Sequence, residues 1–160
     1  MDASFIHFLD RKSIDYLVSR GQLEFVAPNL VLAYSLLEDA RLHLQSARLL
    51  QTSDTSGAFV MAYDAARKSL AAYLVAGGIR ARGGDGGHAV LLSAVRPQLP
   101  KYKSALNEFD WMRQLRNDTE YREADRPPAS EDDVTEGIEA AAEILAIVSN
   151  ALTQGSAGPK

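Results

Sequence analysis

The chain has 160 residues, of which 46% are hydrophobic and 24% are charged, a composition typical of a globular protein with a single core. Its net charge of -4 gives no general attraction to a phosphate backbone, so binding of nucleic acid would require a local basic patch. There is no cysteine, which excludes a disulfide framework, a zinc thiolate site and a thiol nucleophile. No stretch approaches the roughly 20 apolar residues that a membrane span needs, and the N-terminus does not resemble a signal peptide. We therefore expect a soluble cytoplasmic protein with no membrane association.

Residues 1–27 form an N-terminal segment in which "SIDYLVSRG" predicts a short helix with Gly21 past its end. A helix this short is not stable alone, so we expect it to dock on the rest of the chain. Pro28 and Asn29 then mark the start of a long helix that ends near "QTSDTSG". Its apolar positions step by three and four: Leu30, Ala33, Leu37, Ala40, Leu44 and Ala47.

A second long helix is predicted in "GAFVMAYDAARKSLAAYLVAGG", which is rich in alanine, as helices that pack closely often are. Gly77 and Gly78 end it. The glycine-rich "IRARGGDGGH" predicts a loop, and "HAVLLSAV" a short third helix that stops before Pro97 and Pro100. The apolar stripe of the second helix consists of Phe59, Ala62, Ala66, Leu70 and Tyr73.

A fourth helix is predicted from about Lys101, with its apolar stripe at Tyr102, Ala105, Phe109 and Met112. The fifth begins after "PPASEDDV", where Ser130 and Asp133 form a plausible capping box. Its stripe then runs over about five turns, through Val134, Ile138, Ala141, Leu145, Val148 and Leu152.

These elements predict an all-α protein, and no part of the sequence favours a strand. Residues 28–153 should form an antiparallel bundle of four to five principal helices, preceded by the short N-terminal helix. Residues 154–160 should be a disordered tail.

The fourth helix becomes polar on its core-facing side within "WMRQLRNDTEYRE". Continuing the apolar stripe places Arg116 on the next core position, with Arg113 and Glu120 on the same side and Asn117 beside Tyr121. A buried arginine is costly unless it is paired or reaches a cleft. Two interpretations remain open at this point: an intrahelical pair of Arg116 with Glu120, or a polar cleft at the end of the helix.

The stretch "RNDTEY" resembles the signature of the HEPN superfamily, the higher eukaryotes and prokaryotes nucleotide-binding domain. That signature is an arginine, a polar residue, a few further residues and a histidine. "MAYDAARKSLAAYLVAGG" is similar to the second HEPN helix, and "GGHAVLLSAV" to the short third helix. The resemblance covers roughly Asn29 to Leu152 and implies a bundle of HEPN type.

The resemblance also implies an activity, because in such families two domains dimerise and their joined cleft cuts RNA without a metal. The ribose 2′-hydroxyl would attack the adjacent phosphate, with an arginine stabilising the developing charge and a histidine moving protons. Carried over to this chain, Arg116 is the phosphate-stabilising arginine and Asn117 the polar residue after it. Tyr121 completes the catalytic set, and Arg113, Glu120 and His88 are predicted to bind around it.

Tyr121 is a departure, since it stands where many HEPN ribonucleases have their histidine. A tyrosine hydroxyl with a pKa near 10 is ionised in only about one molecule in a thousand at neutral pH, whereas a histidine offers both forms. Tyr121 is therefore a poor general base, although it can donate a hydrogen bond to a phosphate. Of the three histidines, His7 and His43 lie away from the motif, while His88 follows the glycine-rich loop and could approach the cleft.

No cofactor or metal site is predicted. The acids of "EDDVTEG" stand at a helix start, where they favour the positive end of the helix dipole rather than a metal ion. The resemblance implies a homodimer, an RNA substrate and a partner protein such as a nucleotidyltransferase or an antitoxin.

Three functions remain open. The first is an RNA-directed effector of a bacterial toxin–antitoxin or defence module, acting as a metal-independent endoribonuclease. The second is a non-catalytic HEPN module that binds a nucleotide or scaffolds a protein partner. The third is a helical adaptor without a ligand, which the Arg116–Asn117 pair disfavours because a scaffold gains little from a charge on its core face.

Overall fold

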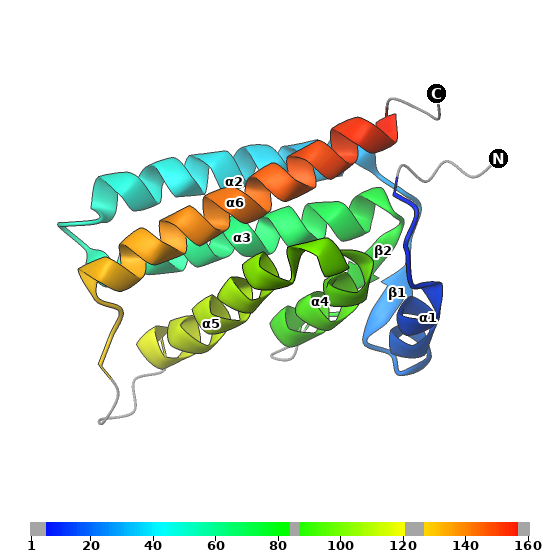
Figure 1. Ribbon diagram of the computed structural model, residues 1–160, viewed down its shortest axis with the longest axis horizontal. Helices are drawn as coiled ribbons and strands as arrows, with labels where there is room; N and C mark the ends of the chain where they lie inside the picture. Colours follow the sequence, from blue (N-terminus) through cyan, green and yellow to red (C-terminus); the bar gives the residue numbers. More distant parts are fainter. Residues whose placement is uncertain (1–5, 84–86, 121–126, 157–160) are drawn as a thin grey trace.

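The computed structural model describes residues 6–83, 87–120 and 127–156. The predicted all-α bundle is confirmed, and the short N-terminal helix is present (Figure 1). None of the described helices is long and apolar enough to cross a membrane. The helices are α1 (Arg11–Ser19), α2 (Leu30–Leu50), α3 (Thr55–Ala76), α4 (Gly87–Val95), α5 (Lys103–Glu120) and α6 (Glu131–Ser156), with two 3-10 turns, η1 (Arg96–Gln98) and η2 (Pro100–Tyr102), before α5.

Side-chain caps fix the starts of several helices. Asp10, Asn29 and Asp54 each accept a hydrogen bond from the backbone N–H three residues later, which satisfies one of the unpaired N–H groups of the first turn. The predicted capping box before α6 is confirmed. The Ser130 N–H donates to Asp133 Oδ2 over 2.8 Å, and the Asp133 N–H donates to Ser130 Oγ over 3.1 Å.

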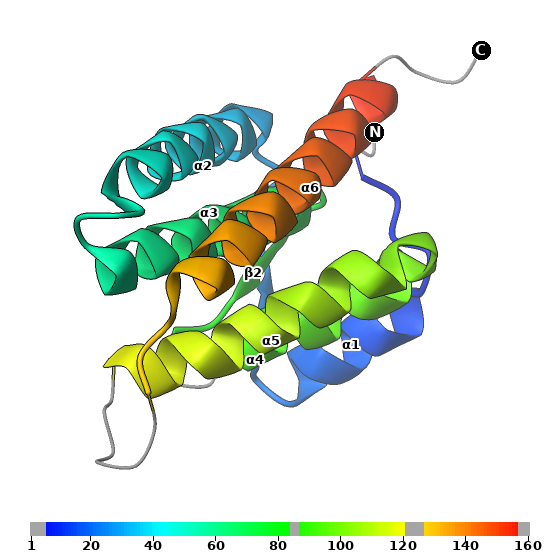
Figure 2. The same ribbon diagram turned by 60° about the vertical axis from the view of Figure 1, so that its left-hand side comes forward.

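Helix α3 is the centre of the fold, since it packs against α2, α4, α5, α6 and strand β2. Figures 1 and 2 show α2 and α6 along one side of it and α4 and α5 along the other. Its small side chains let these neighbours come close, because an alanine side chain extends only a short distance from the helix backbone. The buried alanines of α3 are Ala58, Ala62, Ala65, Ala66, Ala72 and Ala76.

Aromatic side chains fill the space between α3 and α5. Phe59 is fully buried, and the Trp111 ring of α5 packs edge-on against it, with ring centroids 5.8 Å apart and an interplanar angle of 84°. Helix α6 crosses the same region at Gly137, where a Cβ atom would lie only 3.1 Å from the Phe59 ring. The close approach of α6 to the core thus depends on the missing side chain at this position.

A small two-stranded sheet is the main difference from the sequence-based prediction, which contained no strand. Strands β1 (Leu23–Phe25) and β2 (Ile79–Ala81) pair antiparallel, with Glu24 opposite Arg80. Three-residue strands carry no recognisable alternation, and their partners lie far apart in the sequence. Gly78, with φ +81°, makes the turn from α3 into β2, and its carbonyl accepts a hydrogen bond from the Val26 N–H.

The N-terminal segment docks on the bundle through Gln98, which is only 5% exposed. Its side-chain amide donates to the Asp10 carbonyl over 2.9 Å, and its oxygen accepts from the Asp10 N–H over 2.8 Å. The short helix is therefore docked, as predicted, by the bonds of Gln98 together with the buried side chains of Ile14 and Leu17. At the other end of the chain, α6 continues to Ser156, so residues 154–156 of the expected tail are helical.

Candidate functional site

Arg116 lies on the side of α5 that faces α3, where the apolar stripe predicts it. Its side chain is partly buried, and its Nε atom is fully buried without a hydrogen-bond partner among the described residues. The guanidinium carbon lies 5.9 Å from the centroid of the Tyr63 ring, a cation–π distance. Arg116 is therefore held against the core by an aromatic ring, with hydrogen-bonding capacity left over.

Tyr63, from the middle of α3, is the residue on which the site is built. It is 1% exposed, and its ring stacks on that of Phe109 from α5, with centroids 5.4 Å apart and an interplanar angle of 18°. Burial raises the pKa of Tyr63 to about 12, although Arg116 and Arg67 oppose that shift. The Tyr63 hydroxyl consequently stays protonated at neutral pH and can donate a hydrogen bond.

His88 approaches the same tyrosine from the first turn of α4. Its Nδ1 atom lies 2.9 Å from the Tyr63 hydroxyl, and the two ring centroids are 5.6 Å apart. Burial lowers the pKa of His88, and the positive charges of Arg67, Arg116 and Arg113 lower it further against the opposing effect of Asp64. His88 is therefore neutral at pH 7, the form in which a histidine can accept a proton.

Two further arginines surround this cluster, each held by a carboxylate three residues before it. Arg113 donates from Nε and Nη2 to Asp110 Oδ1 over 3.1 and 3.0 Å. Arg67 bonds to Asp64 in the same way, and its Nε lies 2.9 Å from Asp64 Oδ1. Pairing of this kind fixes the orientation of the planar guanidinium groups.

Asp64 also connects α3 to α2. His43 Nδ1 of α2 lies 2.8 Å from Asp64 Oδ2, and Lys68 Nζ lies 3.5 Å from the same oxygen. Burial would raise the pKa of Asp64, but the hydrogen bond and charge of Arg67, with the charges of Lys68 and His43, lower it on balance. His43 thus lies against Asp64 of α3.

Not all of the sequence-predicted site residues are brought together. Arg116 and His88 meet at Tyr63, Arg113 lies beside them with its charge reaching His88, and Asn117 is partly buried at the next position of α5. Only the backbone of Glu120 is described, so its predicted pair with Arg116 stays a prediction, and Tyr121 lies outside the described residues. No group of three or more metal-ligating side chains occurs among the residues that the structure describes.

Tyr63 and Arg67 were not among the site residues predicted from the sequence. Tyr63 lies four residues after Phe59 on the apolar side of α3, where it looks like an ordinary core residue. The available signal was its hydroxyl, because a buried tyrosine hydroxyl nearly always has a hydrogen-bond partner. Arg67 follows Tyr63 by one further helical turn, so the pair shares one side of α3.

The comparison with protein families gives one finding: the model of the HEPN domain matches residues 33–151. The chain belongs to the HEPN domain family. This HEPN match contains Tyr63, His88 and Arg116, and it leaves out α1 and β1. HEPN domains are associated with nucleotides and RNA, and many are ribonucleases. The searches of curated proteins and of solved structures gave no match.

Proposed function

We propose that this HEPN domain is an RNA-directed effector that cuts RNA as a metal-independent endoribonuclease. One observation carries the proposal: an arginine with unused hydrogen-bonding capacity and a neutral histidine meet at the same buried tyrosine. Neither residue is fully enclosed, since both side chains keep some exposure to solvent. A phosphate group placed there would find a positive charge and a proton acceptor side by side.

The proposed reaction is an internal transfer at phosphorus. The ribose 2′-oxygen attacks the adjacent phosphorus and loses its proton to a base, while the bond from phosphorus to the 5′-oxygen breaks. The leaving 5′-oxygen takes up a proton, which gives a 2′,3′-cyclic phosphate and a 5′-hydroxyl. Arg116 stabilises the extra negative charge on the phosphoryl oxygens, and Asn117 and Tyr121 are proposed to add hydrogen bonds.

His88 is proposed to take the part of the motif histidine that Tyr121 replaces. In the tautomer whose Nδ1–H donates to the Tyr63 oxygen, Nε2 carries a free lone pair and can accept the proton of the 2′-hydroxyl. The lowered pKa of His88 keeps this nitrogen unprotonated at neutral pH. Tyr63 then acts as a positioning residue that holds the imidazole.

The family resemblance extends the proposal to the assembly. Two copies would place their α5 ends face to face and share one cleft, and the activity would belong to a bacterial toxin–antitoxin or defence module. A nucleotidyltransferase or an antitoxin protein would be the regulating partner. Localisation in the cytoplasm is part of the same proposal.

A second candidate function follows from the tyrosine at position 121. A chain that lacks the motif histidine, and whose nearest histidine is tied to a buried tyrosine, also fits a non-catalytic HEPN module. Such a module would bind a nucleotide or scaffold a protein partner through the same Arg116 and His88 side chains.

The test is cleavage of a mixed RNA pool in EDTA by the wild-type protein and by Arg116→Ala, His88→Gln and Arg48→Ala variants. Arg48 is an exposed arginine of α2 and serves as the matched control. We expect Arg116→Ala to lower the cleavage rate about 100-fold or more, since removal of one transition-state donor typically does so. Its free energy of unfolding should change by no more than about 1 kcal/mol, because a modest cation–π contact is lost together with a buried unpaired N–H.

The ribonuclease proposal would be supported if wild type and Arg48→Ala produce RNA with cyclic phosphate ends and Arg116→Ala and His88→Gln do not. Equal cleavage by wild type and Arg116→Ala would exclude Arg116 as the phosphate-stabilising residue. No cleavage by folded wild-type protein would favour the non-catalytic module, which nucleotide titration would then test directly.

A further inference from the structure

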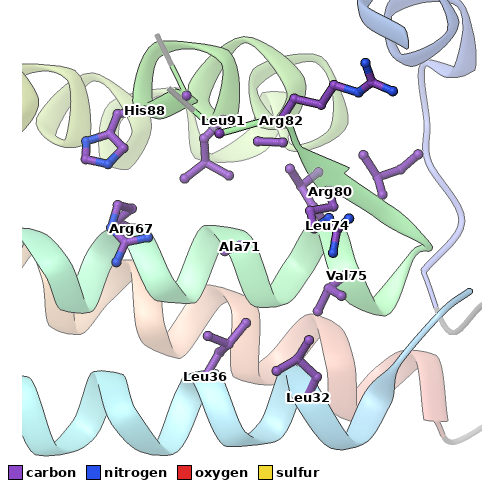
Figure 3. Close-up of a pocket in the computed structure, with 14 residues that line it drawn as sticks. Leu32, Leu36, Arg67, Ala71, Leu74, Val75, Arg80, Arg82, His88 and Leu91 are labelled. Carbon is purple, nitrogen blue, oxygen red and sulfur yellow. The ribbon is translucent and has the colours of Figure 1, made fainter. Parts of the chain in front are cut away.

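A pocket separate from the Arg116 side chain lies between α2, α3, β2 and the start of α4 (Figure 3). Its volume is about 380 Å³, within the range of sites that take small organic ligands. Four basic side chains line it, with Arg67 and His88 at one end and Arg80 and Arg82 at the other. Between them the wall is apolar and includes Leu32, Leu36, Ala71, Leu74 and Leu91.

The end at β2 carries excess positive charge. Arg80 and Arg82 share one carboxylate, Glu24, whose Oε1 lies 2.6 Å from Arg80 Nη2 and whose Oε2 lies 3.9 Å from Arg82 Nε. The Arg82 contact is too long for a hydrogen bond, and its side chain is 60% exposed. In Figure 3 the Arg82 side chain extends outward from this end of the pocket, so its guanidinium group is available to an anion at the pocket mouth.

The apolar wall is poorly covered. Leu32 is 43% exposed although it faces the pocket, and Leu36 and Ala71 are partly exposed. Covering such side chains with an apolar group is favourable, in proportion to the area removed from water. The pocket thus offers a hydrophobic surface next to an exposed arginine that shares its carboxylate with Arg80, so a purely apolar or a purely ionic ligand would fit it less well.

The far end of the pocket is lined by His88, which also contacts Tyr63. A ligand that fills the pocket would therefore contact a residue of the candidate site without contacting Arg116. This shared residue also makes His88 a spectroscopic reporter for the pocket.

We propose that this pocket binds a small amphipathic anion, with its charged group at Arg82 and Arg80 and its apolar part along Leu36, Ala71 and Leu91 toward His88. The charged group is a carboxylate or a phosphate ester, because both match the donor geometry of a guanidinium. The site does not depend on RNA cleavage, so it can be present whichever of the two functions above holds.

The test uses three probes of equal chain length: octanoate, octyl phosphate and octanol. Each competes with the fluorescent dye anilinonaphthalene sulfonate, itself an aromatic anion, for the wild-type protein. We expect at least one of the two anions to displace the dye, and octanol to do so about tenfold more weakly, since it lacks the charge-assisted bond. A preference for octanoate would identify a carboxylate ligand, and a preference for octyl phosphate a phosphate ester.

Variants locate the site. Arg82→Ala should weaken binding of the better anion about tenfold, whereas Arg48→Ala, an exposed arginine outside the pocket, should leave it unchanged. Ala71→Trp should block binding by filling the pocket. If that variant does not fold, Arg82→Ala still tests the site, because the Arg82 side chain is on the surface and its removal should not prevent folding. In wild type, the ring signals of His88 should move on binding while those of His7 stay in place.

Equal displacement by octanol, unchanged affinity in Arg82→Ala, or unmoved His88 signals would each overturn the proposal. None of these measurements involves RNA. If Arg116→Ala loses RNA cleavage but the wild-type protein binds no anion, the pocket proposal alone is rejected. If the wild-type protein binds the anion but Arg116→Ala cleaves RNA as wild type does, the ribonuclease proposal alone is rejected.

Discussion

At the scale of single residues, Tyr63 has two tasks that usually fall to different side chains. Its ring fills the core between α3 and α5, and its hydroxyl holds His88. Arg116 adds a third contact with the same ring. Packing of the hydrophobic core therefore holds the residues of the candidate site in place, which is how precise side-chain placement is usually achieved.

His88 should make the stability of the protein depend on pH. Its pKa in the folded protein lies below the ordinary value of 6.5, so the unfolded chain binds the proton more readily. The contribution of neutral His88 to the free energy of unfolding is complete above pH 6.5, and it is lost as the pH falls through the folded-state pKa of His88. We expect a smaller decrease between pH 7.5 and pH 5.5 in His88→Gln than in wild type, measured by urea unfolding at both pH values.

All other titrating groups are shared by the two proteins, so the difference isolates His88. An identical pH dependence would mean that the His88 imidazole titrates normally in the folded state.

Residue positions along α5 could be predicted, whereas the tyrosine contact could not. The three- and four-residue steps place Arg116 on the core side, and the structure agrees. The meeting of Tyr63 with His88 depends on how α4 packs against α3, and helical periodicity contains no information about that packing. Tyr121 and the Glu120 side chain remain predictions.

At the scale of elements, two glycines with positive φ differ in their surroundings. Gly21 has φ +72° and no atom within 4 Å of the position of a Cβ, whereas at Gly78, with φ +81°, a Cβ would lie 2.8 Å from the Val26 carbonyl oxygen. Left-handed backbone costs about 1 kcal/mol for alanine at either position. Gly78→Ala adds a clash with backbone that cannot move away easily.

We therefore expect Gly21→Ala to lower the free energy of unfolding by about 1 kcal/mol and Gly78→Ala by at least about 2 kcal/mol, measured by urea unfolding. Similar losses in both variants would show that the turn into β2 can relax around a side chain.

Gln98 bonds both backbone groups of Asp10, so we expect it to help keep the N-terminal segment docked. In Gln98→Leu the Asp10 N–H and carbonyl lose their partners, at a cost of about 2 kcal/mol. We expect faster hydrogen exchange of the backbone amides of α1, because these amides open more often when the segment detaches. Gln114→Leu, an exposed position on α5, is the control. Unchanged exchange in Gln98→Leu would assign the docking to the apolar contacts of α1 instead.

The long helices could be predicted from the sequence, whereas the two short paired strands could not. The starts of α2 and α6 follow from local capping side chains, Asn29 and Ser130, which need no tertiary information. Strands β1 and β2 stabilise each other across more than fifty residues of intervening chain, so neither can be recognised alone.

At the scale of the whole molecule, the proposed composite cleft requires two chains. We expect light scattering to give twice the 17.4 kDa mass of one chain at micromolar concentration. Charge reversal in Arg113→Glu, on the proposed cleft side of α5, should weaken the dimer, whereas Arg41→Glu on the exposed side of α2 should leave it intact. A monomer that still cleaves RNA would contradict the shared cleft.

The chain has one tryptophan, and it lies in the contact between α3 and α5, the two helices that carry Tyr63 and Arg116. Trp111 packs against Phe59 of α3, five residues before Arg116 on the same helix. Its fluorescence therefore reports, without any label, whether α5 is seated on α3. A variant whose emission matches wild type has kept the helix that carries Arg116 in place, so loss of activity can be separated from loss of structure in a cuvette.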